Sequence, residues 1–397
     1  MTLRLYYEDA YSIEFDAQIV RAILGDRGTT GIILDRTCFY PTSGGQPCDQ
    51  GSLDTQPVLD VMERDGEIVH WITGALEGPT VHGSVNWPRR FDHMQQHTGQ
   101  HILSQACLKL LGSQTVGFHL GQESSTIDID RAALTPAEAE TVEELANEIV
   151  LADRAVISRL VEPEALPVLE LRKAPAVEHD IRIVEIQGFD RSPCGGTHCS
   201  STGQVGPIAV RKWERRGQQT RVEFLCGWRA LRDYRWKTAM VNELALAFSV
   251  KDKELSDAIV RMMEEGADAR RELHHLRDEL LVAEAAKLLT EASQWNDHRI
   301  VLRAFHERDA QQVTKLASLV TEGQRTVALL GISGTRARLV FASTADSPAN
   351  MAALLKKTCL TFGGNGGGQP HLAQGGGFPG DKVDEALQFA CQALIGT

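Results

Sequence analysis

The chain has few of the features that mark membrane, exported or disulfide-stapled proteins. No stretch comes near the roughly 18 consecutive apolar residues that a membrane-spanning helix needs. The opening MTLRLYYEDAYSIEF carries acidic residues early and lacks the continuous apolar segment of a secretory signal. Eight cysteines lie between Cys38 and Cys391 without paired spacing, which favours a reducing compartment. We therefore expect a cytoplasmic protein that does not engage a membrane.

An excess of basic residues is also missing. The formal net charge is -12 and the isoelectric point is near 5.6, which argues against a general nucleic-acid binder. One segment, VRKWERRGQQTR, is locally basic all the same, and it predicts either a solvated strand edge or a contact with RNA. Its basic residues are Arg211, Lys212, Arg215, Arg216 and Arg221.

The hydrophobic pattern divides the 397 residues into four parts. Short alternating runs separated by Gly, Pro and Asp turns predict a small β-barrel over residues 1–88. A helical period over residues 91–111, followed by strand, turn and helix, predicts an α+β core over residues 89–235, with Thr135 as a helix N-cap. Apolar residues spaced by three or four among dense charges predict a helical, coiled-coil-like arm over residues 236–292.

The remaining residues, 293–397, return to α/β patterning and contain GGNGGGQPHLAQGGG. We interpret this stretch as a glycine-rich loop within a folded domain, whose backbone N–H groups could approach a phosphate. It lacks the Gly-Lys-Ser/Thr sequence of a P-loop. The expected fold is thus multidomain α+β.

Two histidines lie four residues apart in MQQHTGQHILSQA, within the predicted helix. Side chains at i and i+4 share one helix face, so His97 and His101 are placed to grip one metal ion. His93 lies four residues before His97 and offers a second pair of the same geometry. Spacing alone does not choose between the two pairs.

The stretch SPCGGTHCSSTGQVG supplies a second half of a metal site. Cys194 and His198 are close enough to give two ligands from one turn, and the two glycines between them allow the backbone to bend around an ion. Cys199 competes for the same role. The set that suits tetrahedral Zn²⁺ consists of His97, His101, Cys194 and His198.

A third cluster, FYPTSGGQPCDQG, spans residues 39–51. Its two adjacent glycines fit a tight turn, and they equally fit a loop whose backbone amides approach a bound ligand closely.

Four motifs then stand in one order along the chain: CFYPTSGGQPCDQG, HTGQHIL, CGGTH with TGQVGPI, and GGNGGGQPHLAQGGG. The same order occurs in the editing regions of alanyl-tRNA synthetases. The chain resembles the free-standing alanyl-tRNA editing proteins, the AlaX family, in their long form. The resemblance covers nearly the whole chain, and the length leaves no room for an aminoacylation domain.

This resemblance implies an aminoacyl-tRNA deacylase, a carboxylic ester hydrolase that removes serine, and glycine as a second candidate, from mischarged tRNA(Ala). It implies one Zn²⁺ per chain on the four ligands above, which selects His97 and His101 over the alternative pair. It also implies a DHHA1-like, tRNA-contacting domain over residues 293–397. A homodimer formed through the C-terminal half is compatible with the pattern.

The resemblance also assigns roles to the glycine motifs. The loop of Gly44, Gly45 and Gln46 closes over the aminoacyl end, and Thr98 joins it at the reaction centre. We expect tRNA contacts from Arg211, Lys212, Arg215, Arg216, Gly366, Gly367 and Gly368.

An editing site must hydrolyse the seryl ester and leave the correct alanyl ester intact. A pocket that hydrogen-bonds the serine hydroxyl would achieve this, because alanine leaves the polar partner unpaired. Thr98, His119 and Thr126 are candidates for that partner, and Thr42 is a further substrate-binding candidate from the glycine loop.

Several alternatives stay open at this point. Four protein ligands would make the zinc site a closed one, so either one ligand yields to water or the ion positions the substrate; we favour positioning. No carboxylate adjoins either zinc motif as a metalloprotease-like base would. The rival functions are editing of a threonyl-type tRNA, a non-catalytic zinc-stabilised tRNA-binding protein, and a DHH phosphoesterase, whose Asp-His-His motif the sequence lacks.

Overall fold

The computed structural model describes residues 2–25, 28–175, 177, 179–323 and 325–396. The chain forms two compact units, Met1–Ala247 and Phe248–Thr397. Both combine helices with sheets, so the predicted multidomain α+β organisation is confirmed. No helix among the described residues is long and apolar enough to cross a membrane.

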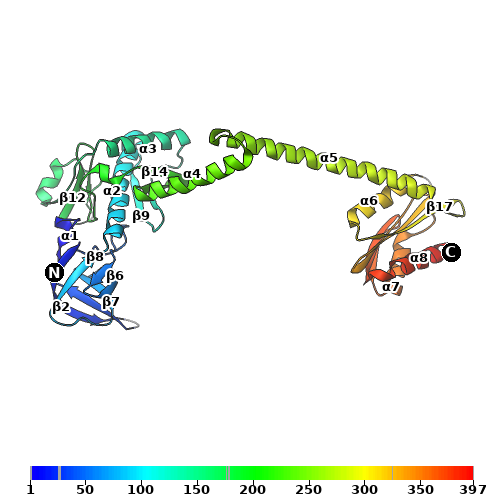
Figure 1. Ribbon diagram of the computed structural model, residues 1–397, viewed down its shortest axis with the longest axis horizontal. Coiled ribbons are helices and arrows are strands. Elements are labelled where there is room, and N and C mark those ends of the chain that lie inside the picture. Colours follow the sequence, from blue (N-terminus) through cyan, green and yellow to red (C-terminus); the bar gives the residue numbers. More distant parts are fainter. Residues whose placement is uncertain (1, 26–27, 176, 178, 324, 397) are drawn as a thin grey trace. The chain divides into compact units, whose positions relative to one another are not determined.

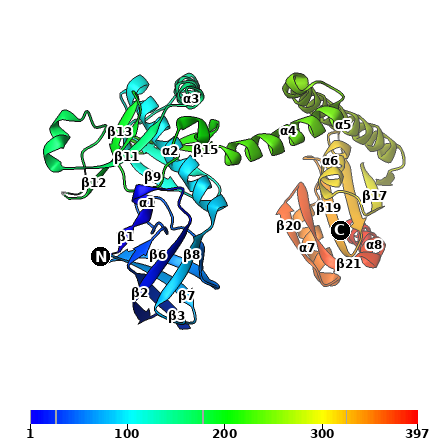
Figure 2. The ribbon, with the colours of Figure 1, turned by 60° about the vertical axis from the view of Figure 1, so that its left-hand side comes forward.

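The first unit opens with a six-stranded closed barrel (Figure 2). Its strands alternate buried and exposed residues, and large apolar side chains such as Phe15, Phe39, Ile68 and Ile72 fill its interior. The short β1 (Leu3–Arg4), α1 (Leu5–Glu8) and β4 (Arg36–Thr37) lie outside the ring. In barrel order the strands are β2 (Glu14–Leu24), β3 (Thr29–Leu34), β7 (Glu67–Thr73), β6 (Gln56–Arg64), β5 (Gly51–Leu53) and β8 (Thr80–Val85).

Helix α2 (Trp87–Leu111) leaves the barrel and runs into the α+β part of the unit (Figures 1 and 2). It begins four residues before the predicted start, because the Asn86 side chain accepts a hydrogen bond from the Arg89 N–H and Pro88 fits the first turn. It ends at Gly112, whose φ of 64° is a left-handed C-cap. Most of its middle is buried, which places its polar side chains inside the unit.

Two sheets and α3 (Pro136–Leu151) surround α2. The predicted N-cap is confirmed: Thr135 accepts from the Glu138 N–H, and the Glu138 side chain returns the bond as a capping box. The first sheet has the order β14 (Ile208–Arg216), β15 (Gln219–Cys226), β10 (Ser125–Ile129) and β9 (Thr115–Leu120). The second has the order β11 (Val156–Val161), β12 (Ile181–Ile186) and β13 (Asp190–Pro193). The short helices η2 (Pro163–Val168) and η3 (Thr202–Val205) and helix α4 (Trp228–Phe248) complete this part.

The second unit begins with η4 (Asp252–Glu254) and the long helix α5 (Leu255–Thr290). The predicted helical character of the arm is confirmed, while its coiled-coil pairing stays a prediction. Only the C-terminal turns of α5 pack on the sheet, through Leu281, Ala285 and Leu288. The sheet has the order β16 (Ser293–Trp295), β17 (His298–His306), β18 (Thr326–Ser333), β19 (Arg336–Ser343), β21 (Leu372–Pro379) and β20 (Asn365–Gln369). The other helices are α6 (Ala310–Val320), α7 (Met351–Thr361), η5 (Gly380–Lys382) and α8 (Val383–Ile395).

The prediction of a glycine-rich loop is wrong. Most of residues 363–377 form the antiparallel hairpin of β20 and β21, with Gly366 directly opposite Gly375. A Cβ on Gly366 would lie 2.9 Å from Leu355, and one on Gly375 would lie 2.9 Å from Cys359. The glycines therefore let α7 rest directly on the hairpin, and they do not form a phosphate loop at a helix N-terminus.

Candidate metal centre

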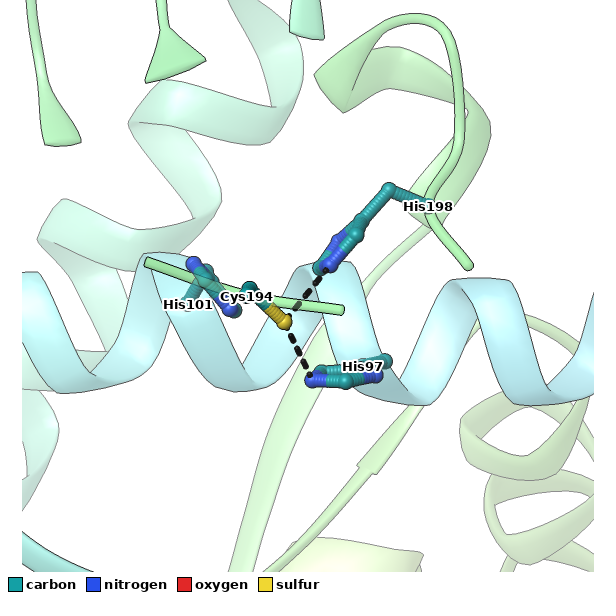
Figure 3. A group of neighbouring side chains, drawn as sticks. All are labelled: His97, His101, Cys194 and His198. Atoms are coloured by element: carbon teal, nitrogen blue, oxygen red, sulfur yellow. Dashed lines mark hydrogen bonds between the residues drawn. The ribbon is translucent and has the colours of Figure 1, made fainter. Parts of the chain in front are cut away.

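Four side chains from distant parts of the first unit converge on one point (Figure 3). His97 and His101 project from neighbouring turns of α2, and Cys194 and His198 project from the loop that follows β13. Their ligand atoms all lie within 4.8 Å of one another. The Cys194 Sγ is 3.4 Å from His97 Nε2 and 3.3 Å from His198 Nε2.

The rival ligands lie apart from this cluster in the part of the chain that the structure describes. His93 is buried on α2 one turn before His97, and it lines a different cavity. Cys199 is also buried, and its backbone N–H donates to Thr98 Oγ1 at 3.0 Å. Burial raises the pKa of the Cys199 thiol to about 12, so this sulfur remains a neutral thiol.

Each histidine of the cluster has a hydrogen-bond partner on its outer ring nitrogen. His97 Nδ1 lies 2.7 Å from Gln46 Oε1, His101 Nδ1 lies 3.1 Å from Asp190 Oδ2, and His198 Nδ1 lies 3.2 Å from Thr98 Oγ1. Such partners fix the tautomer and turn the Nε2 atoms inward as ligands.

The Asp190 carboxylate is itself fixed. It accepts a hydrogen bond from Arg172 Nε at 2.8 Å and lies within hydrogen-bond distance of the Ser192 hydroxyl. The expectation that no carboxylate adjoins the zinc motifs is therefore wrong, because Asp190 contacts His101. It contacts the outer nitrogen of His101, so it orients a ligand and is not placed as a base for water.

The protonation states of the cluster suit a metal ion. Burial alone would raise the pKa of Cys194, but the imidazoles of His97 and His198 outweigh it and hold that pKa well below the usual range. Burial lowers the pKa of His198 to about 3, whereas at His101 burial is outweighed by Asp190 and Cys194, which raise its pKa. A thiolate with three imidazoles is a donor set for Zn²⁺ and similar transition ions, and not for Mg²⁺ or Ca²⁺, which prefer oxygen.

The loop that carries two of the ligands has no room for larger residues. A Cβ on Gly196 would lie 2.2 Å from His97 Cε1, so a side chain there would displace the ligand ring. Arg182 of β12 donates to the carbonyls of Cys194 and Gly196 at 2.9 and 2.8 Å, which holds the loop against that strand.

A cavity of about 370 Å³ opens beside the cluster. Its walls come from the glycine loop, α2, β9 and the segment around residue 172. Gly44 lines it directly, whereas Gly45 packs so close to β9 that a Cβ would lie 2.4 Å from the Phe118 carbonyl oxygen. Gln46 is buried between His97 and Thr197. The predicted loop thus forms one wall of the cavity and also holds a ligand.

The predicted readers of the serine hydroxyl do not line this cavity. Thr98 is fully buried behind His198, which makes it a positioning residue. His119 and Thr126 pair across β9 and β10, and Thr126 lines a separate cavity with Lys212. Thr42 Oγ1 accepts from the Cys48 N–H inside the barrel loop.

Sequence reasoning missed Gln100 and Thr115, which do line the cavity. Gln100 Nε2 and Thr115 Oγ1 both donate to Ser104 Oγ, each at 2.7 Å. Helical periodicity could have predicted Gln100, because a residue three positions after His97 lies near the helix face that carries both histidines. Nothing in the sequence links Thr115 to it.

The predicted basic surface on β14 is largely neutralised. Arg211 and Lys212 both pair with Glu223, at 3.1 and 3.3 Å, and Arg216 pairs with Glu214 at 2.6 Å. Arg215 donates to the Gly217 carbonyl. Contacts of these residues and of Gly366, Gly367 and Gly368 with tRNA stay predictions.

Two family models match the chain. The threonyl and alanyl tRNA synthetase second additional domain covers residues 181–223, which include Cys194 and His198, and the DHHA1 domain covers residues 296–396. A solved C-Ala domain from Aquifex aeolicus alanyl-tRNA synthetase is 21% identical and covers 27% of this chain, with a TM-score of 0.25, too low to support a structural argument.

Similar curated proteins are of two kinds. The alanine–tRNA ligases of Methanococcoides burtonii and Methanothrix thermoacetophila are 30% and 32% identical over 99% and 95% of this chain. The chain spans less than half of their length, 44% and 42%. The alanyl-tRNA editing protein AlaX-L of Pyrococcus horikoshii is 32% identical over 400 residues, and the match covers 94% of each protein. The chain therefore belongs to the family of AlaX-L alanyl-tRNA editing proteins.

Proposed function

We propose that this protein is a trans-editing hydrolase that deacylates seryl-tRNA(Ala), with glycyl-tRNA(Ala) as a second substrate, at a zinc-dependent site. The observation that carries the proposal is the buried cluster of one cysteine and three histidines beside a cavity closed by the glycine loop. Membership of the AlaX-L family supports the choice of tRNA(Ala) over a threonyl-type tRNA.

The chain holds the zinc through His97, His101, Cys194 and His198. When bound there, Zn²⁺ would supply Lewis-acid charge beside the cavity and orient the aminoacyl end. No carboxylate lines the cavity among the described residues, so a metalloprotease-like base is absent. Lys173 at its wall brings positive charge, which suits the phosphates at a tRNA 3′ end, whereas Arg172 is paired with Asp190.

Serine selectivity has a structural candidate in Gln100. Its amide nitrogen is engaged with Ser104, which leaves the carbonyl oxygen available in the cavity to accept a hydrogen bond from the serine hydroxyl. An alanyl side chain offers no donor, so this oxygen would lose its solvation without a partner, which disfavours alanine. Thr115 and Ser104 hold the amide in place.

The central test measures deacylation of seryl-tRNA(Ala), alanyl-tRNA(Ala), seryl-tRNA(Thr) and seryl-tRNA(Ser) by the zinc-loaded protein. We expect seryl-tRNA(Ala) to be hydrolysed at least about 100-fold faster than alanyl-tRNA(Ala), because the methyl side chain lacks the hydroxyl that the cavity binds. A preference for seryl-tRNA(Thr) would move the protein to threonyl-type editing. Failure on all four substrates would leave a zinc-stabilised tRNA-binding protein.

The variant Gln100→Leu tests the source of the selectivity. We expect kcat/KM for seryl-tRNA(Ala) to fall about 10- to 100-fold, since the hydroxyl loses its acceptor. Hydrolysis of glycyl-tRNA(Ala), which has no hydroxyl to bind, should fall much less, and the zinc content should stay at one per chain. Equal losses on both substrates would show that Gln100 does not read the hydroxyl.

A further inference from the structure

A second and larger cavity lies in the first unit, on the same helix as the metal cluster. Its volume is about 790 Å³, and its walls come from α2, α4, the end of the glycine loop and the turn after β9. It shares no lining residue with the cavity beside the cluster. The proposed hydrolysis therefore makes no use of it.

Aromatic rings form two of its walls. Trp228 at the start of α4 is 55% exposed, so its ring face is open to a ligand in the cavity. Trp87 at the start of α2 stacks on Phe91 with ring centroids 5.2 Å apart, so its orientation is fixed. An exposed ring and a fixed ring in one cavity provide surfaces on which a planar base can stack.

Positive charge accompanies the rings, although the whole chain carries -12. Arg229 is neutralised by Asp92 and also donates to the Gly121 carbonyl. For Arg89 and Arg232 no carboxylate lies within ion-pair distance among the residues that the structure describes. The cavity thus keeps a net positive charge that an anionic ligand would balance.

Two buried polar atoms in the wall are unsatisfied. His93 Nδ1 and Gln95 Oε1 have no hydrogen-bond partner within the described parts of the chain, and the two residues are only 2% and 5% exposed. A buried polar atom without a partner is costly, so such atoms call for a ligand or a water that pairs with them. The two residues themselves line this cavity.

We infer that this cavity binds one nucleotide of single-stranded RNA, with the base on Trp228 and the phosphate at Arg89 and Arg232. The inference rests on the proposed function, since it assigns the nucleotide to the single-stranded 3′ end of the tRNA substrate.

The placement of the two cavities fits this assignment. Ser43 and Gly44 line the cavity beside the cluster, whereas Pro47 and Gln50, a few residues on, line the larger one. On β9 and its following turn, Phe118 lines the first cavity and Gly121 the second. The same loop and the same strand with its following turn therefore contribute residues to both cavities, as one strand of RNA that occupies both would require.

The test compares two esters that carry the same reacting group. We expect Trp228→Ala combined with Arg232→Ala to lower kcat/KM for seryl-tRNA(Ala) by roughly 10- to 100-fold, mainly through KM, because stacking and phosphate contacts are lost. Hydrolysis of 3′-seryl-adenosine, which has no upstream nucleotide, should stay unchanged. The matched controls Arg235→Ala and Trp236→Ala lie on the same helix outside the cavity, and they should change neither rate by more than about 2-fold.

A binding measurement separates this inference from the proposed function. A fluorescently labelled single-stranded RNA tetranucleotide ending in CCA should bind the zinc-loaded protein. The double variant should bind it roughly 10-fold or more weakly, and Trp228→Phe combined with Arg232→Ala should restore part of the affinity. Equal affinity for wild type and double variant would overturn the nucleotide site. If wild type binds the RNA in this Trp228-dependent way but hydrolyses neither ester, the hydrolase function fails while the nucleotide site stands.

Discussion

Replacing Cys194 with alanine is expected to remove the bound zinc and to lower seryl-tRNA(Ala) deacylation by at least about 1000-fold. The thiolate is the only anionic donor of the four, so without it three imidazoles alone must hold a dication. Metal content by atomic absorption and single-turnover deacylation measure the two effects. Loading with Co²⁺ gives a third readout, because the thiolate-to-cobalt charge-transfer band should appear in wild type and be missing in the variant.

Cys199→Ala is the matched control for this experiment. Cys199 is a buried neutral thiol close in sequence, and its sulfur is not part of the cluster. We expect this variant to keep one zinc per chain and near-normal deacylation, with a stability loss of about 1 kcal/mol for the small cavity. Retention of stoichiometric zinc and full activity by a folded Cys194→Ala protein would remove Cys194 from the metal centre.

The ligand set of this site could be anticipated from sequence because both halves are local. A separation of four residues on a helix places two side chains on one face whatever the rest of the fold does, and this is how His97 and His101 lie on α2. Cys194 and His198 are likewise joined by a short loop. The donor types join the two halves into one predicted zinc set, and the resemblance selects His97 and His101 over His93 and His97.

The groups that orient the ligands could not be anticipated, since each comes from a distant segment. Gln46 reaches His97 across 51 residues, and Asp190 reaches His101 across 89. No periodic pattern records such contacts, because they depend on how the barrel and the second sheet pack on α2. Glycine content misleads in a different way. It predicts a loop both around Gly44, where the residues form one, and in β20 and β21, where the glycines instead allow close packing.

A buried ion pair connects the barrel to α2. Arg90 and Asp49 are 0% and 1% exposed, and Arg90 Nη2 lies 2.5 Å from Asp49 Oδ2. The other guanidinium donors reach the carbonyls of Ala10 and Cys38, and Asp49 also accepts from the Tyr40 N–H. Each guanidinium nitrogen and both carboxylate oxygens of the pair are thus engaged, which is the condition under which a buried ion pair is tolerated.

Arg90→Met is accordingly expected to lower the free energy of unfolding of the first unit by about 3–5 kcal/mol, because it leaves the Asp49 carboxylate buried without its counter-charge. Urea titrations followed by tryptophan fluorescence measure this, since of the six tryptophans only Trp295 lies in the second unit. Arg89→Met is the control: that neighbour is half-buried and donates only to the Cys48 carbonyl, so we expect a change within about 1 kcal/mol.

Adding Asp49→Asn to Arg90→Met separates the loss of charge balance from the loss of packing. The amide oxygen can still accept from the Tyr40 N–H, while the buried negative charge disappears, so the double variant should be more stable than Arg90→Met alone. If it is less stable by the full sum of the two single effects, the pair contributes by shape and not by charge.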